Sequence, residues 1–371
     1  MKKILIFHIS QFGGHRKASE NIKEALILKE PNLEVINLNG FAYLSPYVEK
    51  FVDSIYTLAI KYLPPLWGKI YDKKKVIKTI TPFTKLINLI AAPKFLSLIK
   101  KIKPAVIIAT QAFPCGIIAE LKKNRWINVP LIGVVTDYYP HRLWIHQGVD
   151  IYTVACQGAK DVLTTEGVNP EKVKILGIPI SVNFLKAYDK KELAKKFGFS
   201  LNTNTILLMG GGLGIGPIKK IAKVLDDVEE KFQLIVICGK NKKLFNWFKK
   251  SVKYFKKRLF YFGYIDFVDK LMDFSDIIIT KAGGLTISEA LAKGMATIVV
   301  NPIPGQEERN VEYLERKKAI LKTNSVKEIG GLVKTLLRDR NKLFSLKRNA
   351  LQNATIDSSL RIVNLVLSYL N

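Results

Sequence analysis

The stretch from Thr280 to Ala290, TKAGGLTISEA, places two glycines between a predicted buried strand and a predicted helix. The strand Ile277–Thr280 comes before the glycines, and the helix Leu285–Lys293 follows them. The amino end of a helix carries unpaired N–H groups and a positive dipole end, so a glycine turn there favours an anionic ligand. Glu289 lies about one turn into this helix, where a carboxylate can bind a ribose diol or merely complement the helix dipole. The stretch therefore predicts a strand–turn–helix unit that can bind a nucleotide.

A second glycine-rich turn, Met209–Gly216 (MGGGLGIG), follows the predicted strand Thr205–Met209. Each glycine costs backbone entropy on folding, so five of them within seven positions are hard to justify as packing alone. A loop whose N–H groups surround a phosphate explains them better. The turn lacks the Gly-Lys-Ser/Thr ending of a Walker loop, so it predicts phosphate contact of another type.

Short apolar runs and helical patterns alternate along the whole chain, which is typical of parallel sheets covered on both faces. Two successive series of this kind predict an α/β fold with two Rossmann-like domains. The glycine and proline of Gly177–Ile180 place the boundary, giving domains 1–178 and 179–355 and a last helix within 356–371. The predicted strands are Ile4–Ile9, Leu33–Leu38, Ala105–Ala109, Leu131–Thr136, Ile151–Ala155, Val173–Leu176, Thr205–Met209, Leu234–Cys238, Leu259–Phe262, Ile277–Thr280 and Thr297–Val300.

Two polar segments follow strands of the first series. Ser10–His15 (SQFGGH) is a glycine turn that ends in His15, and a neutral imidazole at a sheet edge can accept a proton from an attacking hydroxyl. Thr136–His146 (TDYYPHRLWIH) contains Asp137, which could orient His15 or replace it as the base. The histidines of this segment could also suggest zinc, but no CxxC or HExxH spacing supports a metal site.

The charge of the chain is strongly positive, with 59 Lys and Arg against 31 Asp and Glu, a formal net charge of +28. Such a surplus implies an anionic partner: nucleic acid, an anionic membrane surface or a phosphorylated substrate. In Leu66–Lys103 apolar residues recur at helical spacing among lysines, a pattern that suits the headgroup plane of a membrane but also a helix on a core. In the membrane interpretation, which the family resemblance given below favours, the residues at the membrane are Trp67, Lys73, Lys74, Lys75, Lys78, Phe83 and Lys85.

A second basic run, Lys240–Arg258, contains no acid and five aromatic residues. Basic and aromatic residues together can bind nucleic acid by stacking, although no known nucleic-acid module surrounds this run. We interpret it as a helix packed on the second domain, with a solvated basic face that could also touch lipid.

The order of these segments resembles a known family. A strand, GGH and a helix, then TD…H…W.H, MGGG, KAGGLTISEA and PIPGQEERN (302–310) are similar to the monogalactosyldiacylglycerol synthases and the processive diacylglycerol glucosyltransferases of glycosyltransferase family 28. The peptidoglycan N-acetylglucosaminyltransferase is related to both. The chain departs from relatives at Arg309, where an acid is common, and in the QFGGH loop. The resemblance implies a GT-B fold, in which parallel sheets face a central cleft and the C-terminal helix returns to the N-terminal domain.

The resemblance also implies a reaction. An inverting hexosyltransferase would move glucose or galactose from a UDP-sugar to the hydroxyl of diacylglycerol, forming a β-glycosyl lipid without a metal or cofactor at the sugar-nucleotide site. It would do so as a peripheral protein on the cytoplasmic face of the cell membrane, with anionic lipid as an activator and no nucleic-acid partner. Two alternatives stay open: transfer of N-acetylglucosamine to a prenyl-diphosphate-linked peptidoglycan precursor, and a non-catalytic protein that binds sugar nucleotides. The sequence leaves open glucose against galactose, processivity and oligomeric state.

The resemblance assigns roles to individual residues. His15 and Asp137 are the candidate bases, and Gly13, Gly14 and Trp144 would bind the acceptor. In the donor site, Tyr264 and Ile265 would hold uracil, and Glu289 the ribose. The remaining donor residues are Gly211, Gly212, Gly283, Gly284 and Leu285 at the diphosphate, and Gln306 and Glu307 at the sugar hydroxyls.

Overall fold

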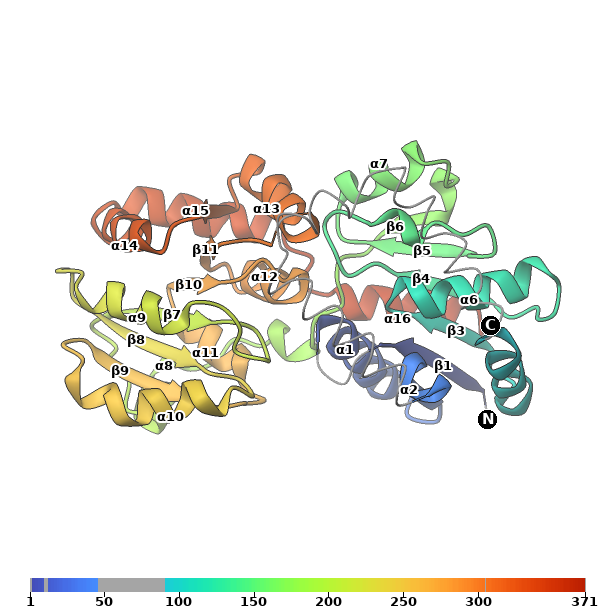
Figure 1. The fold of residues 1–371 in the computed structure, drawn as a ribbon, viewed down its shortest axis with the longest axis horizontal. Helices are drawn as coiled ribbons and strands as arrows, with labels where there is room; N and C mark the ends of the chain where they lie inside the picture. The colour runs from blue at the N-terminus through green and yellow to red at the C-terminus, as the bar shows by residue number, and fades with distance from the viewer. Residues whose placement is uncertain (1, 10–12, 46–90, 304, 371) are drawn as a thin grey trace. The chain divides into compact units, whose positions relative to one another are not determined.

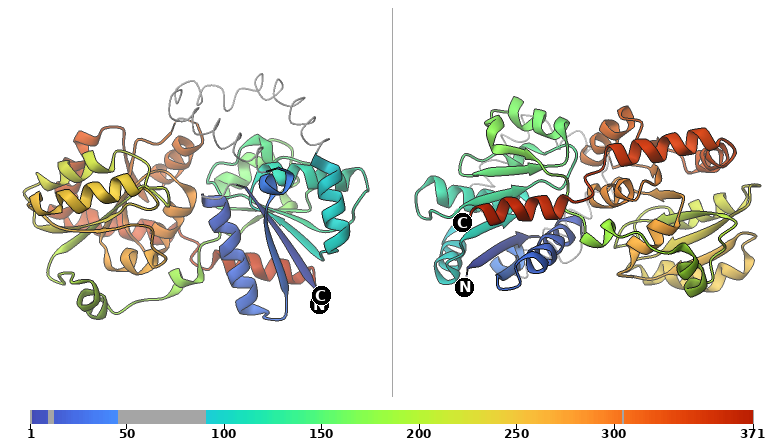
Figure 2. Two further views of the ribbon diagram at one scale, coloured as in Figure 1. Left: turned by 60° about the horizontal axis from the view of Figure 1, so that its bottom comes forward. Right: turned by 180° about the vertical axis from the view of Figure 1, so that it is seen from behind.

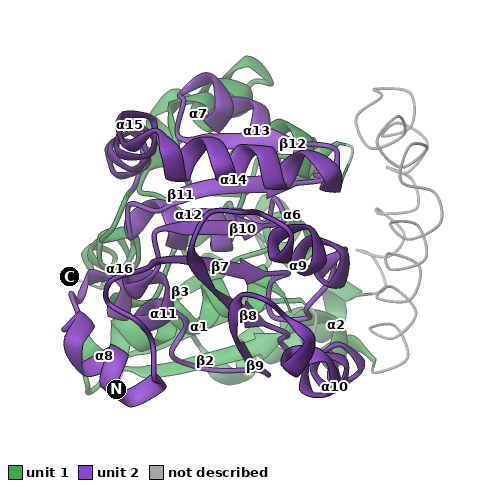
Figure 3. Ribbon diagram, turned by 90° about the vertical axis from the view of Figure 1, so that its left-hand side faces the viewer, with its two compact units in different colours: residues 1–182, 303–310, 355–371 green, residues 183–302, 311–354 purple. Residues whose placement is uncertain are grey.

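The computed structural model describes residues 2–9, 13–45, 91–303 and 305–370 (Figure 1). The chain divides into two compact units, coloured separately in Figure 3. Unit 1 contains Met1–Val182, Ile303–Asn310 and Thr355–Asn371, and unit 2 contains Asn183–Pro302 and Val311–Ala354. The segment Ile303–Asn310 therefore groups with unit 1, although the sequence places it inside the second series of strands and helices.

Unit 1 contains a parallel six-stranded sheet in the order β2-β1-β3-β4-β5-β6. The side chains from Ile4 to Phe7 on β1 are completely buried, as expected for a central strand covered on both faces. The chain adds β2 on one side of β1 and then returns to add β3 on the other, so the switch point of the sheet lies between β1 and β3. Ligands of such folds bind at the carboxyl ends of the strands at this point. The strands are β1 (Lys3–His8), β2 (Glu34–Asn39), β3 (Val106–Ala109), β4 (Leu131–Val134), β5 (Ile151–Val154) and β6 (Val173–Ile175).

Helices cover both faces of this sheet. The core on one face contains α6 and part of the helical residues 91–102, and the core on the other contains α1 and α16. Helix α16 lies beside α1 (Figure 2), with Ile362, Val363 and Val366 completely buried. The predicted return of the C-terminal helix to the first domain is confirmed. The helices are α1 (Gly14–Lys29), α2 (Gly40–Leu44), α6 (Ala112–Lys123), α7 (Gln157–Thr165) and α16 (Ser358–Ser368).

Unit 2 contains a second parallel six-stranded sheet, in the order β12-β11-β10-β7-β8-β9. Its switch point lies between β7 and β10, by the same reasoning, and the two glycine-rich turns of the sequence follow these two strands. The strands are β7 (Asn204–Met209), β8 (Phe232–Ile237), β9 (Arg258–Phe262), β10 (Ile277–Thr280), β11 (Ala296–Val300) and β12 (Ile320–Thr323). The helices are α8 (Lys190–Phe197), α9 (Ile218–Asp226), α10 (Lys242–Ser251), α11 (Val268–Phe274), α12 (Gly284–Ala292), α14 (Ile329–Arg338) and α15 (Arg340–Gln352). Helix α13 (Gln306–Arg316) belongs to unit 1 up to Asn310 and to unit 2 from Val311.

The basic run Lys240–Arg258 forms the expected helix over only part of its length. Helix α10 ends at Ser251, and Arg258 already begins β9. Phe248 is completely buried in the core of unit 2, which explains part of the aromatic content by packing. Within the parts of the chain that the structure describes, no helix is both long and apolar enough to cross a bilayer.

Gly177 lies at the predicted domain boundary, where both its backbone conformation and its neighbours disfavour a side chain. Its φ of +83° is left-handed, and a Cβ there would lie 2.6 Å from the Thr355 Cβ. Gly198 also has a left-handed φ, +75°, but a Cβ there would meet no atom within 4 Å. We expect Gly177→Ala to lower the free energy of unfolding of unit 1 by about 3 kcal/mol or more, and Gly198→Ala to lower that of unit 2 by only about 1–2 kcal/mol. Denaturant unfolding of the two variants checks this; equal losses would contradict the packing at Gly177.

Candidate functional site

His15 lies at the switch point of the sheet in unit 1. It is in the first turn of α1, and its Nδ1 is 2.8 Å from the carbonyl oxygen of Thr110, the residue that follows β3. A carbonyl can only accept, so Nδ1 carries the proton and Nε2 keeps a lone pair. The Thr136 hydroxyl oxygen, just beyond β4, lies 2.9 Å from the same Nδ1. The imidazole is thus fixed in the tautomer that a general base requires.

The pKa of His15 is lowered from its ordinary value of 6.5. Burial of the imidazole is the main cause, since it disfavours the charged form, although part of the residue is still exposed. The negative charge of Asp137 and the hydrogen bond to Thr110 act in the opposite direction and only reduce the shift. The imidazole is therefore neutral at pH 7 and able to accept a proton at Nε2.

Asp137 is buried and follows Thr136 in the same loop. Its Oδ1 accepts a hydrogen bond of 3.1 Å from the side-chain amide of Asn310, whose own oxygen accepts from the Tyr139 N–H at 2.9 Å. Asn310 is 1% exposed, so this amide is a fixed part of unit 1. The arrangement holds the Asp137 carboxylate near His15, where its negative charge favours the protonated form of the imidazole and so raises its pKa.

Trp144 lies in the core of unit 1. It is 3% exposed, and its carbonyl accepts from the Tyr152 hydroxyl. Its assignment to the acceptor stays a prediction from the sequence, and the structure shows a packing role for the same side chain. Leu143, the residue before it, is 41% exposed and is the apolar surface residue of this loop.

The two histidines of the Thr136–His146 segment, His141 and His146, make contacts within the protein itself. His141 Nδ1 accepts from the Leu143 N–H at 3.0 Å. His146 packs against α6 so closely that a Cβ on Gly116 would lie 2.8 Å from its ring, and burial lowers its pKa. Among the described residues no three side chains of His, Cys, Asp or Glu gather in a way that could hold a metal ion.

Gly13 and Gly14 lie at the start of α1, and both are exposed. Gly13 precedes the helix without a side-chain cap, and a Cβ at that position would meet no atom of the described residues within 4 Å. The role of the two glycines at the acceptor stays a prediction from the sequence. Ser10, Gln11 and Phe12 of the same loop lie outside the described residues.

In unit 2, the glycines of Met209–Gly216 divide into two groups. A Cβ on Gly210 or Gly214 would lie 2.0 Å from a backbone oxygen, so packing does explain these two, contrary to the expectation from sequence. Gly211 has a left-handed φ of +68°, and the nearest atom to a Cβ there is the Lys281 Cε at 3.4 Å. Around Gly212 the space is open except for the Tyr264 ring at 3.9 Å. These two residues are the ones assigned to the diphosphate from sequence.

The second glycine turn lies beside the first. Lys281 follows β10, and its Cε is also 3.8 Å from where a Cβ on Gly283 would lie, so this one side chain lies next to both turns. Helix α12 begins at Gly284 and has no side-chain cap, which leaves its first N–H groups for a ligand. Leu285 and Glu289 are buried, the latter in the second turn of the helix. Lys281 belongs to the TKAGGLTISEA motif, but the sequence alone does not indicate a role for it.

Tyr264 and Ile265 come directly after β9. Tyr264 is 60% exposed, and the ammonium of Lys240 lies 5.1 Å from the centroid of its ring. The Lys240 N–H also donates to the Gly212 carbonyl at 3.0 Å, which links the loop after β8 to the first glycine turn. The structure thus groups Gly212, Lys240 and Tyr264 at one edge of the second sheet.

Gln306 and Glu307 begin α13, in the segment that groups with unit 1. The Glu307 Oε2 accepts from the Ile303 N–H at 3.1 Å, so one carboxylate oxygen closes its own turn. This oxygen therefore stabilises the start of α13 itself. The structure places the backbone of Gln306 and not its side chain.

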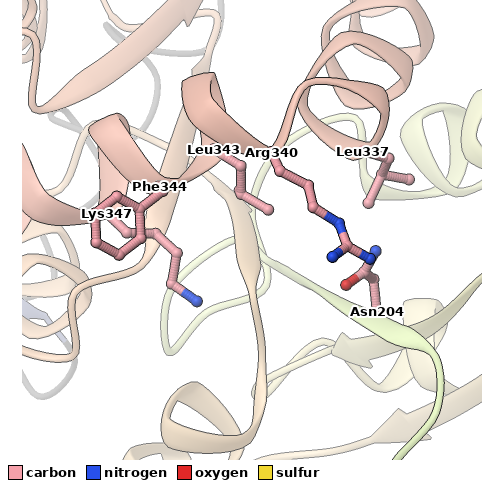
Figure 4. A pocket seen from close by; sticks show the side chains of 6 residues that line it. All are labelled: Asn204, Leu337, Arg340, Leu343, Phe344 and Lys347. Carbon is pink, nitrogen blue, oxygen red and sulfur yellow. The ribbon is translucent and has the colours of Figure 1, made fainter.

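A cavity of about 340 Å³ in unit 2 lies elsewhere (Figure 4). Asn204, the first residue of β7, lines it, whereas the glycine turn follows the last residue of the same strand. The cavity is therefore at the amino ends of the strands, whereas the two glycine turns follow the carboxyl ends. It is not part of the candidate site. Its other lining residues are Leu337, Arg340, Leu343, Phe344 and Lys347.

Comparison with known proteins identifies the family. Residues 15–180 match the family model of monogalactosyldiacylglycerol (MGDG) synthase, and residues 205–362 match the glycosyltransferase family 28 C-terminal domain. A processive diacylglycerol β-glucosyltransferase of Bacillus licheniformis is 31% identical over 358 residues, which cover 94% of this chain and 90% of the relative.

Two solved structures share the fold. The crystal structure of Acinetobacter baumannii MurG has a TM-score of 0.65 at 16% identity, covering 99% of this chain and all of the other. The S. aureus MnaA–UDP structure has a TM-score of 0.66 at 19% identity, covering 100% of this chain and 97% of the other. With two parallel Rossmann-like sheets, these likenesses confirm the GT-B fold. The chain belongs to the glycosyltransferase family that contains the MGDG synthases and the processive diacylglycerol β-glucosyltransferases.

Proposed function

We propose that this glycosyltransferase transfers glucose from UDP-glucose to the hydroxyl of diacylglycerol and forms a β-glucosyl lipid. The named activity of the Bacillus relatives, at 31% identity over nearly the whole chain, supports this choice of sugar and acceptor. The observation that carries the chemistry is the imidazole of His15, held by Thr110 with Nε2 unprotonated at the switch point of unit 1.

In the proposed reaction, Nε2 of His15 accepts the proton of the acceptor hydroxyl as its oxygen forms a bond to the anomeric carbon of glucose. The bond from that carbon to the UDP oxygen breaks at the same time, and UDP leaves with the electron pair. One displacement inverts the anomeric centre, so an α-linked donor gives a β-linked product. Asp137 does not take the proton; its carboxylate stabilises the imidazolium of His15.

Unit 2 would bind the donor. The open space at Gly211 and Gly212 and the uncapped start of α12, Gly283 to Leu285, suit the diphosphate. Lys281 adds a positive charge next to both turns, where charge develops on the leaving phosphate.

The remaining donor contacts follow the sequence assignment. Tyr264 and Ile265 would hold uracil, with Lys240 next to the Tyr264 ring, and Glu289 would bind the ribose. Gln306 and Glu307 would bind sugar hydroxyls.

The acceptor is a lipid, so the protein must reach a membrane. We propose peripheral attachment at the cytoplasmic face, driven by the +28 net charge and anionic lipid. The membrane residues assigned from sequence, from Trp67 to Lys85, lie outside the described residues.

Product analysis tests the proposal. The enzyme is incubated with UDP-glucose, UDP-galactose or UDP-N-acetylglucosamine, each with diacylglycerol or with a prenyl-diphosphate-linked peptidoglycan precursor, and the lipids are identified by mass spectrometry. We expect hexosyl diacylglycerol from UDP-glucose. A product only on the peptidoglycan precursor would replace the proposal with the related transferase, and UDP binding without any product would favour a non-catalytic protein.

The pKa of His15 sets the pH dependence. Because this pKa lies below 6.5, we expect kcat/KM to stay constant from about pH 8 to 6.5 and to fall at lower pH as the base becomes protonated. Asp137 raises this pKa, so Asp137→Asn should move the acid limb to still lower pH. A folded-state pKa below the unfolded value also means that the stabilising contribution of the neutral imidazole is present above pH 6.5 and is lost as the pH falls. If kcat/KM already fell as the pH was lowered from about 8 to 7, His15 could not be the base.

A further inference from the structure

The exposed residues of α9 and α10 in unit 2 are nearly all lysines. Every exposed residue of α9 is a lysine: Lys219, Lys220 and Lys223. From the start of α10 to residue 253, every exposed residue except Asn246 is a lysine: Lys242, Lys243, Lys249, Lys250 and Lys253. We call these eight residues the lysine face.

The two helices present this face together. Trp247 of α10 lies under two lysines of α9, with the ammonium of Lys219 at 5.3 Å and that of Lys223 at 5.8 Å from its ring centroid. Both helices pack their apolar sides on the same core of unit 2 (Figure 3). Lys219 and Lys223 of α9 therefore lie next to α10, and the two helices belong to one side of unit 2.

Within the described residues, no member of the lysine face forms an ion pair. The nearest acids, at the end of α9, are already engaged: Asp227 pairs with Lys256 at 3.1 Å, and Asp226 accepts from the Lys257 N–H at 2.9 Å. Other surface helices of the chain are different, because Arg16 of α1 pairs with Glu20 at 2.7 Å and Lys334 of α14 with Glu229 at 3.3 Å. Like charges one helical turn apart, such as Lys219 and Lys223, destabilise a helix. Surfaces that only keep a protein soluble carry charges of both signs. Eight lysines without an acidic partner therefore indicate a binding surface.

The chemistry of the face favours an anionic bilayer over nucleic acid. Lysine is a hydrated point charge that suits a diffuse layer of headgroups, whereas arginine is preferred for bidentate phosphate recognition. Arg258 is turned away, since its guanidinium bonds the Gly198 carbonyl at 2.6 Å. Trp247 is covered by lysines and cannot stack on a base. Tyr254, next to Lys253, is 75% exposed, as suits an aromatic side chain at a membrane interface.

We propose that the lysine face of α9 and α10, with Tyr254 at its end, is a docking surface for an anionic lipid bilayer, so that unit 2 has a membrane contact of its own. This contact goes beyond the proposed reaction and is separate from the membrane residues assigned to the first domain. Each lysine near an anionic leaflet increases partitioning by about fivefold at moderate salt, and the effect is screened as salt rises.

The first test removes part of the lysine face. The variant K223Q/K249Q/K250Q/K253Q is compared with K191Q/K195Q/K231Q/K327Q, which removes the same charge from exposed positions elsewhere in unit 2. Sedimentation with vesicles of phosphatidylglycerol and phosphatidylcholine measures partitioning at several salt concentrations. We expect the first variant to partition at least about tenfold more weakly than the control, with the difference vanishing at high salt. Equal partitioning of the two variants would overturn the proposal.

A second measurement reports on the surface directly. In a Cys156→Ser background, which leaves the two buried cysteines, an environment-sensitive fluorophore is attached to Y254C or to L185C; Leu185 is an exposed residue of unit 2 that is not part of the lysine face. We expect a blue shift at position 254 with phosphatidylglycerol vesicles and none at position 185. Sedimentation without a shift at 254 would show that another surface binds.

Two controls separate this proposal from its alternatives. Binding to single-stranded or duplex oligonucleotides that is lost in the lysine-face variant, with vesicle binding unchanged, would replace the bilayer by nucleic acid. Turnover of detergent-dispersed diacylglycerol tests the reaction independently of vesicles, and we expect it to be unchanged in the lysine-face variant. Its failure in the wild-type protein would count against the proposed function and not against the docking surface.

Discussion

Replacing His15 by alanine is expected to lower kcat by about 10²- to 10⁴-fold, the range for loss of a positioned general base. The physical reason is the fixed tautomer: Thr110 holds the proton on Nδ1, and burial keeps Nε2 unprotonated. UDP binding, which we assign to unit 2, should be unchanged when it is measured by calorimetry. An H15A enzyme with near wild-type kcat would show that His15 is not the base.

Two further variants distinguish the base from the residues that position it. Thr136→Val removes the hydroxyl beside Nδ1 but leaves the Thr110 carbonyl, so we expect only a several-fold loss of kcat. Asp137→Asn keeps the size of the side chain and removes the charge that supports the imidazolium, so we expect a loss between those of Thr136→Val and His15→Ala. If Asp137→Asn abolished turnover while His15→Ala retained most of it, the two roles would have to be exchanged.

The second large effect is expected at Lys281. Its side chain lies next to Gly211 and Gly283, and we place it at the phosphate that leaves with UDP. Lys281→Gln should therefore lower kcat by about 10²-fold, because a fixed charge at a developing anion contributes mainly in the transition state. Steady-state kinetics with varied UDP-glucose measures this effect.

Lys240→Gln is the matched control. Lys240 lies over the Tyr264 ring at the proposed uracil end of the site, so its loss should mainly raise KM for the donor, by several-fold. If both variants changed KM alone, Lys281 would be a ground-state contact and the leaving-group role would be wrong.

Much of the fold follows from the sequence because buried parallel strands are apolar along their whole length. All eleven predicted strands occur, with shifts at their ends. The strand β12 was missed because it is an edge strand of four residues whose two central side chains are only half-buried. Its sequence, ILKT, therefore contains no continuous apolar run.

The positions of His15 and Gly211 in the fold were predictable, because each belongs to a glycine-containing turn that follows a buried strand. The site was not predictable where long-range packing decides. Trp144 turned out to lie in the core, and Asn310 turned out to hold Asp137, a contact between residues 173 positions apart. Lys281 illustrates a third case, because only the folded chain shows that its side chain lies beside both glycine turns.

The stereochemistry of the product tests the central claim most directly. The wild-type enzyme is given UDP-α-glucose and diacylglycerol, and the anomeric proton coupling of the first glucolipid is measured by NMR spectroscopy. Direct attack by a hydroxyl that His15 deprotonates predicts the large coupling of a β-glucoside. The small coupling of an α-glucoside would contradict a single displacement, and with it the role of His15.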